Sequence, residues 1–95
     1  MKFQEEQIKE KLTAFRGWEY QNGQLEKTYS FSSFGKAVEF VNKVAVLAES
    51  LDHHPDIIIR YNKVICQTSS HDVQGITERD FKLIKEIEKI AVVSI

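Results

Sequence analysis

The chain has little cysteine, proline or glycine, and it has no long hydrophobic run. Of its 95 residues, one is cysteine, one is proline and four are glycine. The single cysteine, Cys66, cannot form an internal disulfide and fits a reducing compartment. No apolar stretch approaches the roughly 20 residues of a membrane span, and the charged start MKFQEEQIKEKL is unlike a signal peptide. We therefore expect a cytoplasmic protein, with a nuclear location as the alternative.

The chain also has no large excess of positive or negative charge. The net charge is -1 and no block of Lys and Arg stands out, which argues against direct nucleic-acid binding, because phosphate contacts need a concentrated basic surface. The glycines are scattered and form no phosphate-binding loop. With 42% hydrophobic and 28% charged residues, the composition indicates one globular domain over residues 1–95, without repeats or linkers.

The first half of the chain predicts a helix, a hairpin and a longer helix. Residues 4–15 carry apolar side chains at helical spacing. Asn22-Gly23 is a strong hairpin signal, because both positions tolerate positive φ. In the strand that follows, Lys27 interrupts one apolar face. The residues that share this face are Leu25, Tyr29 and Phe31.

A long amphipathic helix is predicted from Phe34 to Leu51, after an N-cap at Ser32-Ser33. The predicted core stripe consists of Phe34, Ala37, Val38, Val41, Val44, Ala45, Ala48 and Leu51. Phe40, Val46 and Leu47 lie off this stripe. A second apolar face of this kind indicates contact with another subunit.

The second half predicts another hairpin and a last helix. Residues 57–61 and 64–69 are rich in β-branched residues, with a turn between them. Thr77 to Asp80 resembles a capping box that opens the last helix, and Glu88 interrupts the apolar stripe of that helix. The order α-β-β-α-β-β-α predicts an α+β fold, a four-stranded antiparallel sheet with helices packed on one face.

The stretch AESLDHHPDIIIRYN, residues 48–62, holds the candidate chemistry. Pro55 disfavours a helical conformation at His54, so the long helix should end near residue 52 or 53. Glu49 and His53, four apart, would share a face of its last turn, with His54 pointing elsewhere. His71, in the loop SSHDVQG, could lie alongside. Three imidazoles would supply a proton donor and a proton acceptor near neutral pH.

Other interpretations of these residues stay open. A histidine at a helix C-terminus is a common complement to the helix dipole, which would make His53 structural. Adjacent histidines are a weak metal motif, because zinc ligands are spaced so that they converge. We therefore predict no metal site and no cofactor. Cys66 lies within a predicted strand and is better explained as a small core residue than as a nucleophile.

Together these residues form the pattern Glu49-x3-His53-His54-Pro55-x5-Tyr61-x9-His71-x8-Asp80. This pattern resembles the signature of the pterin-4a-carbinolamine dehydratases, the family that includes the dimerization cofactor of a hepatocyte transcription factor. The segments Gly17-Trp18, AESLDHHP, YNKV and GITERDF also look like family segments in family order, so the resemblance runs from about residue 17 to residue 93. An aromatic residue common two places after the proline is replaced by Ile57.

The resemblance implies dehydration of 4a-hydroxytetrahydropterin to quinonoid dihydropterin, a step that recycles the pterin cofactor of aromatic amino-acid hydroxylases. His53, His54 and His71 match the family histidines that line the pterin site. Carboxylates are expected to orient the imidazoles or to hold the polar edge of the pterin. The expected orienting or binding residues are Glu49, Asp80 and Tyr61, with Asp52 and Asp72 as weaker candidates and Trp18 as either a pocket or a core residue.

The resemblance also implies assembly, because family members are dimers or tetramers that form by sheet extension and helix packing. The second apolar face of the long helix and the apolar ending IAVVSI fit a homodimer or homotetramer. Two further functions are weighed against the dehydratase. One is a non-enzymatic module that stabilises a transcription factor or another partner protein, and the other is a metal-dependent hydrolase.

Overall fold

The computed structural model describes residues 1–94, with side chains through residue 92. Its elements are α1 (Glu5–Leu12), β1 (Glu19–Gln21), β2 (Gln24–Ser30), α2 (Phe34–Leu51), β3 (Asp56–Arg60), β4 (Lys63–Thr68) and α3 (Glu78–Ser94). The predicted α+β class and element order are therefore confirmed. Among the helices of this described part, none combines the length and the apolar composition that a membrane span needs.

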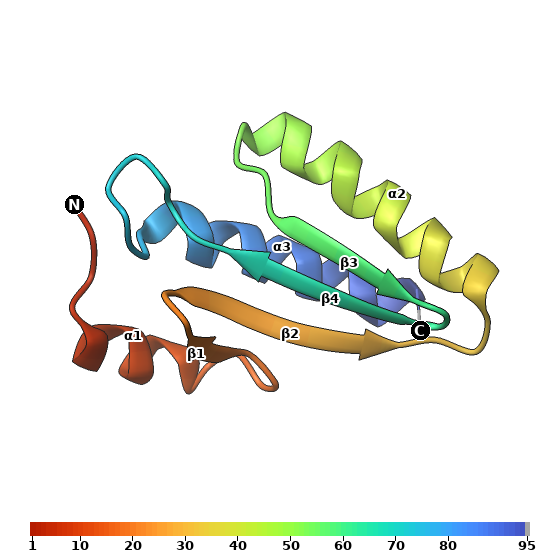
Figure 1. Ribbon diagram of the computed structural model, residues 1–95, viewed down its shortest axis with the longest axis horizontal. Coiled ribbons are helices and arrows are strands. Elements are labelled where there is room, and N and C mark those ends of the chain that lie inside the picture. Colours follow the sequence, from red (N-terminus) through yellow and green to blue (C-terminus); the bar gives the residue numbers. More distant parts are fainter. Residues whose placement is uncertain (95) are drawn as a thin grey trace.

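The strands form one antiparallel sheet in the order β1-β2-β4-β3. Strand β4 pairs with β2 on one side and with β3 on the other. Helices α2 and α3 run along the sheet, while α1 lies beside β1 at one end (Figure 1). Because β3 begins where β4 stops, the end of α2 and the loop after β4 lie at the same end of the sheet, opposite the β3–β4 turn.

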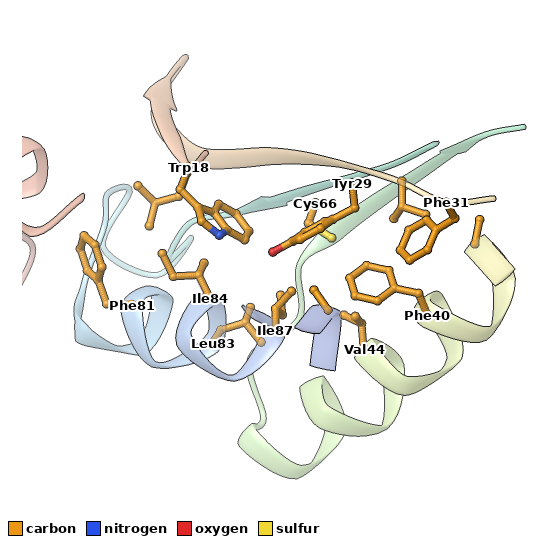
Figure 2. Close-up of a cluster of buried hydrophobic side chains, with 14 of the residues drawn as sticks. Trp18, Tyr29, Phe31, Phe40, Val44, Cys66, Phe81, Leu83, Ile84 and Ile87 are labelled. Atoms are coloured by element: carbon orange, nitrogen blue, oxygen red, sulfur yellow. The ribbon is translucent and has the colours of Figure 1, made fainter. Parts of the chain in front are cut away.

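The core lies between the sheet and the two long helices (Figure 2). Phe40 of α2 packs on Tyr29 of β2 and on Phe31, with ring centroids 4.9 Å apart in both pairs. From α3, Leu83, Ile84 and Ile87 complete the cluster. Burial of these large side chains is the main term that stabilises a domain of this size.

Four of the predicted positions on the long helix are wrong. Phe40, placed off the core stripe, is fully buried, whereas Phe34, placed on it, is 53% exposed. Phe34 is the first residue of α2 and protrudes at its end, while Phe40 lies three residues after Ala37 and four before Val44, both buried. Leu47, also placed off the stripe, packs against the core, whereas Ala45, placed on it, is exposed. The exposed apolar surface of α2 is therefore at Phe34 and at Val46, which is 72% exposed.

Lys27 and Glu88, which interrupt the predicted apolar faces of β2 and α3, contact each other between the sheet and α3. The Lys27 Nζ lies 2.8 Å from Oε2 of Glu88. The same oxygen accepts a hydrogen bond from Nε1 of Trp18, at 3.1 Å, and one from the hydroxyl of Tyr29. Burial acts to raise the pKa of Glu88, but the three hydrogen bonds outweigh it, and the pKa lies below its usual value. Burial and the bond to Glu88 raise the pKa of Tyr29, which remains a donor.

This cluster should make stability depend on pH. A carboxyl group whose pKa is lowered by folding stabilises the protein above its ordinary pKa of about 4.3, and that contribution disappears as the pH falls through the folded value. Because Glu88 is partly exposed, we expect Glu88→Gln to lower the free energy of unfolding at pH 7 by only about 1 kcal/mol. Urea titrations of both proteins should show this difference shrinking below about pH 4.

Glu86→Gln is the matched control for this measurement. Glu86 lies on the same helix, its side chain is about as exposed as that of Glu88, and its carboxylate bonds to Lys89 at 3.0 Å. Such pairs contribute about 0–1 kcal/mol, so the control should stay close to the parent. A Glu88→Gln penalty that is equally large at pH 3 and pH 7 would contradict the assignment of an ionised Glu88.

Candidate active site

Asp80 lies at the start of α3 and is fully buried. Its Oδ2 accepts a hydrogen bond from the backbone N–H of Thr77 at 2.9 Å, as the predicted capping arrangement requires. The first turn of a helix is electrostatically favourable for a carboxylate, because unpaired N–H groups point toward it. The helix start therefore supplies a site at which a buried negative charge is tolerated.

Three side chains complete the surroundings of the Asp80 carboxylate. Its Oδ1 lies 2.7 Å from Nε2 of His53 and 2.7 Å from Oγ1 of Thr68, and its Oδ2 accepts from Oγ of Ser70 at 2.8 Å. An ionised carboxylate only accepts hydrogen bonds, and a backbone N–H and two hydroxyls already donate to this one. The pattern assigns Asp80 as ionised and His53 as the tautomer with its proton on Nε2. The other ring nitrogen, Nδ1, is then an unprotonated acceptor.

The end of α2 directs His53 toward Asp80. The N–H of His53 donates to the carbonyl of Ala48, and the N–H of Asp52 donates to that of Glu49, which is the pattern of a Schellman motif. Asp52 has φ 52°, in the left-handed region that Asp tolerates better than most residues. The helix thus ends at Leu51, as predicted, and the chain reverses so that His53 is half-buried rather than on the helix surface.

Glu49 bonds to the second histidine and not to the first. Its Oε2 lies 2.5 Å from Nε2 of His54, and both side chains are largely exposed. The expectation that Glu49 and His53 share a helical face is wrong, because α2 has already ended before His53. Each of the two adjacent imidazoles therefore has its own carboxylate, one buried and one exposed.

His71 lies in the loop that follows β4, at the same end of the sheet. Within the described residues its imidazole makes no hydrogen bond. The loop itself is fastened by paired backbone bonds between Ser70 and Gly75 and by an ion pair from Arg79 to Asp72 at 2.8 Å. The hydrogen bond from Arg79 is the main reason that the pKa of Asp72 is lowered. Asp72 is therefore engaged by Arg79, and His71 presents a free ring next to the anchored Ser70.

The structure does not bring three of the predicted site residues to this cluster. Trp18 lies in the core with its indole N–H on Glu88. Tyr61 is 72% exposed in the β3–β4 turn, at the opposite end of the hairpin. The side chain of Asp52 is exposed and makes no bond to a histidine, so the contribution of Asp52 is its backbone conformation.

Other chemistry has little support in the described part of the chain. Burial raises the pKa of the Cys66 thiol to about 12, which makes it a poor nucleophile. Among the described residues, no group of three His, Cys, Asp or Glu side chains could hold a metal ion. A groove of about 730 Å³ runs between α1 and α3 over Phe15 and Phe81, and no histidine lines it.

Comparison with known proteins identifies the family. The profile of the family described as pterin 4 alpha carbinolamine dehydratase matches residues 1–90. A protein of Sulfolobus acidocaldarius is 46% identical over 90 residues, which are 95% of this chain and 99% of that protein. The chain belongs to the pterin-4a-carbinolamine dehydratase family. The Sulfolobus relative itself carries the dehydratase name provisionally.

Solved structures agree with this family assignment. A Brucella melitensis protein described as a transcriptional coactivator/pterin dehydratase superposes with a TM-score of 0.91 at 31% identity, covering 96% of this chain and 99% of that one. A pterin dehydratase-like protein described as a RuBisCO assembly factor of the alpha-carboxysome superposes with a TM-score of 0.70. At 20% identity, over 81% of this chain and 92% of that one, it shares the fold of the dehydratase family.

Reasoning from the sequence missed two members of the Asp80 cluster, Thr68 and Ser70. Both are buried. Thr68 is the last residue of β4 and Ser70 lies two residues beyond it, and both hydroxyls face the Asp80 carboxylate. The sequence does contain one signal for them. Along β4, the alternate residues that face inward change from the apolar Val64 and Cys66 to residues with hydroxyl groups.

The two carboxylates should differ sharply in their effect on stability. Asp80→Ala leaves several buried donors without an acceptor, and each buried donor left unsatisfied costs about 1–3 kcal/mol. Glu49→Ala removes an exposed partner and should cost less than about 1 kcal/mol. Urea unfolding of the two alanine variants measures both values. Equal penalties would show that the Asp80 cluster is not the anchor that its geometry implies.

Proposed function

We propose that this protein dehydrates 4a-hydroxytetrahydropterin to quinonoid dihydropterin by histidine acid–base catalysis. The observation that carries the proposal is the hydrogen bond between His53 and the buried, ionised Asp80, with His54 and His71 at the same end of the sheet. Family membership supports the substrate class. In a cell, the product would be returned to the pterin pool that aromatic amino-acid hydroxylases use.

The reaction needs one proton delivered and one removed. The bond between C4a and its hydroxyl oxygen breaks as a donor protonates that oxygen, and a base takes a proton from a ring nitrogen, so that the net loss is water. We assign the base to His53, because its Nε2–H is held by Asp80 and its Nδ1 carries the lone pair. Asp80 then faces the imidazolium that forms, as a buried carboxylate does in other histidine sites.

The donor in this scheme is an exposed histidine. His54, paired with Glu49, and His71, with an unbonded ring, both stand on the solvent side of the cluster. Either ring can deliver a proton to a leaving hydroxyl and recover it from water. No covalent intermediate is needed, which agrees with the burial of Cys66.

A second candidate function is stabilisation of a partner protein. It is favoured by the description of the Brucella structure as a coactivator as well as a dehydratase. The two functions are separable in this chain, because partner binding would use exposed apolar residues such as Phe34 and Val46 rather than the buried Asp80. Variants that abolish dehydration while keeping the fold intact should leave partner binding unaltered.

Removing the histidines should test the catalytic proposal most directly. We expect His53→Ala, His54→Ala and His71→Ala each to lower turnover at least about tenfold, roughly 1.4 kcal/mol of transition-state stabilisation. Stopped-flow measurement of carbinolamine dehydration, above the uncatalysed rate, provides the readout. Glu39→Gln, an exposed change on α2, is the control. Near-native turnover in all three histidine variants would refute the proposal.

Asp80 and Thr77 separate a catalytic role from helix capping. Asp80→Asn keeps the shape and one acceptor oxygen but loses the charge, and we expect turnover to fall at least about tenfold. Thr77→Ala removes a capping hydroxyl, should lower the free energy of unfolding by about 0.5–2 kcal/mol, and should keep turnover within about threefold of the parent. Both are assayed at a temperature at which they are folded. Equal turnover in the two variants and the parent would leave Asp80 only a capping role.

We also propose a homo-oligomer, for which the exposed apolar residues of α2 are the evidence. A valine that is 72% exposed in the middle of a helix is better covered by a second subunit. Light scattering at micromolar concentrations should give a multiple of the monomer mass, and Val46→Glu should lower it. Lys82→Glu, at an exposed residue of α3 outside the apolar ending, is the control. A monomer mass for the parent protein would contradict this prediction.

A further inference from the structure

Two buried hydroxyls face the Asp80 carboxylate, and the proposed mechanism gives them no role in the proton transfers. Thr68 is 2% exposed and donates to Oδ1, and Ser70 is 1% exposed and donates to Oδ2. The preceding inward positions of β4 hold Val64 and Cys66, which are apolar. A buried hydroxyl costs free energy unless it is hydrogen-bonded, so packing alone does not explain hydroxyls at these two positions.

The protons of this cluster can be placed by counting donors. Each hydroxyl has one proton. Ser70 uses its proton on Oδ2 of Asp80, so in the 2.8 Å contact between Ser70 and Thr77 the donor is Thr77. The Thr77 hydroxyl oxygen in turn accepts from the backbone N–H of Arg79 at 3.2 Å. The hydroxyls therefore form a directed chain that ends on the carboxylate.

Thr68 acts on the oxygen that His53 also uses. Its hydroxyl and Nε2 of His53 both lie 2.7 Å from Oδ1. With the other oxygen held by Ser70 and Thr77, the plane of the carboxylate is fixed from both sides. All the other neighbours of this carboxylate donate hydrogen bonds to it, and an ionised carboxylate can only accept. His53 must therefore also donate, through Nε2.

We propose that Thr68 and Ser70 are positioning residues, which keep Asp80 an acceptor in a fixed plane and thereby fix His53 as the tautomer with its proton on Nε2 and its lone pair on Nδ1. Neither residue contacts the reacting atoms. The effect on turnover rests on the proposed dehydratase function, whereas the tautomer is a property of the folded protein alone.

The tautomer can be measured without substrate. Protein labelled with ¹⁵N-histidine gives long-range proton–nitrogen spectra in which the protonated and unprotonated ring nitrogens differ, and the alanine variants of the three histidines assign the signals. We expect the parent to show His53 with the proton on Nε2. Asp80→Asn supplies the reference for the opposite tautomer, because its amide N–H₂ can turn toward Nε2 as a donor. A parent protein with the His53 proton on Nδ1 would overturn the proposal, whatever the variants do.

Thr68→Val, which keeps the shape and removes the hydroxyl, tests the positioning role. We expect a mixture of His53 tautomers and a fall in kcat of about three- to tenfold, the equivalent of one lost hydrogen bond, with KM unchanged. Thr68→Ser restores the hydroxyl and should restore both readouts. Cys66→Ala, at the preceding inward position of β4, controls for loss of packing and should keep the parent tautomer. Ser70→Ala should resemble Thr68→Val.

The outcomes separate this inference from the proposed function. If the parent does not dehydrate carbinolamine, the tautomer spectra of the parent, Thr68→Val and Thr68→Ser still decide whether the hydroxyls set the tautomer. If the parent is active and Thr68→Val retains both its turnover and the parent tautomer, the positioning role is overturned and the dehydratase function stands. Loss of turnover with the tautomer unchanged would also overturn it.

Discussion

The buried carboxylate of Asp80 joins parts of the chain that are distant in sequence. Its oxygens contact the second residue after the end of α2, the last residue of β4, the loop beyond it and the backbone before α3. A charge that is fully buried is costly unless it is paired and hydrogen-bonded. This carboxylate satisfies that condition only when all four segments are in place. The arrangement of the histidines is therefore a consequence of the fold and not of the local sequence around them.

The cluster runs from the core to the solvent. Asp80 has no exposed surface, the side chain of His53 is 11% exposed, and that of His54 is 55% exposed. The inner imidazole is thus held in one orientation by a buried partner, while the outer one has an exposed partner and more freedom. Such a gradient fits two different tasks in proton transfer, one that depends on a fixed geometry and one that depends on exchange with water.

Much of this organisation could be predicted from the sequence, because it depends on short-range patterns. The Asn22-Gly23 turn, the end of α2 before Pro55 and the bond from Asp80 back to Thr77 each follow from local preferences of a few neighbouring residues. The partners of Lys27 and Glu88 could not be predicted, since each residue only interrupts its own element. They lie 61 residues apart along the chain, and their pairing appears only when β2 packs over α3.

The wrong predictions on α2 and in the site also concern contacts between elements that are distant in sequence or that follow a reversal of the chain. Helical spacing alone allows more than one stripe on a helix with apolar residues on two sides, and the sheet selects the one that contains Phe40. The partner of Glu49 depends on the left-handed conformation of Asp52, which turns His54 instead of His53 toward the helix. The hydroxyl of Thr68, at an inward position of β4, indicates that a buried polar partner exists but not which residue it is.

The connection between α2 and β3 has a thermodynamic consequence for any ligand. It contains only residues 52–55. Two backbone hydrogen bonds hold Asp52 in a left-handed conformation. Pro55 fixes its own φ and restricts the conformation of His54. The conformational entropy of this segment is lost when the chain folds. A ligand that meets the two histidines therefore finds their backbone already ordered, and its binding free energy is not reduced by the cost of ordering a loop.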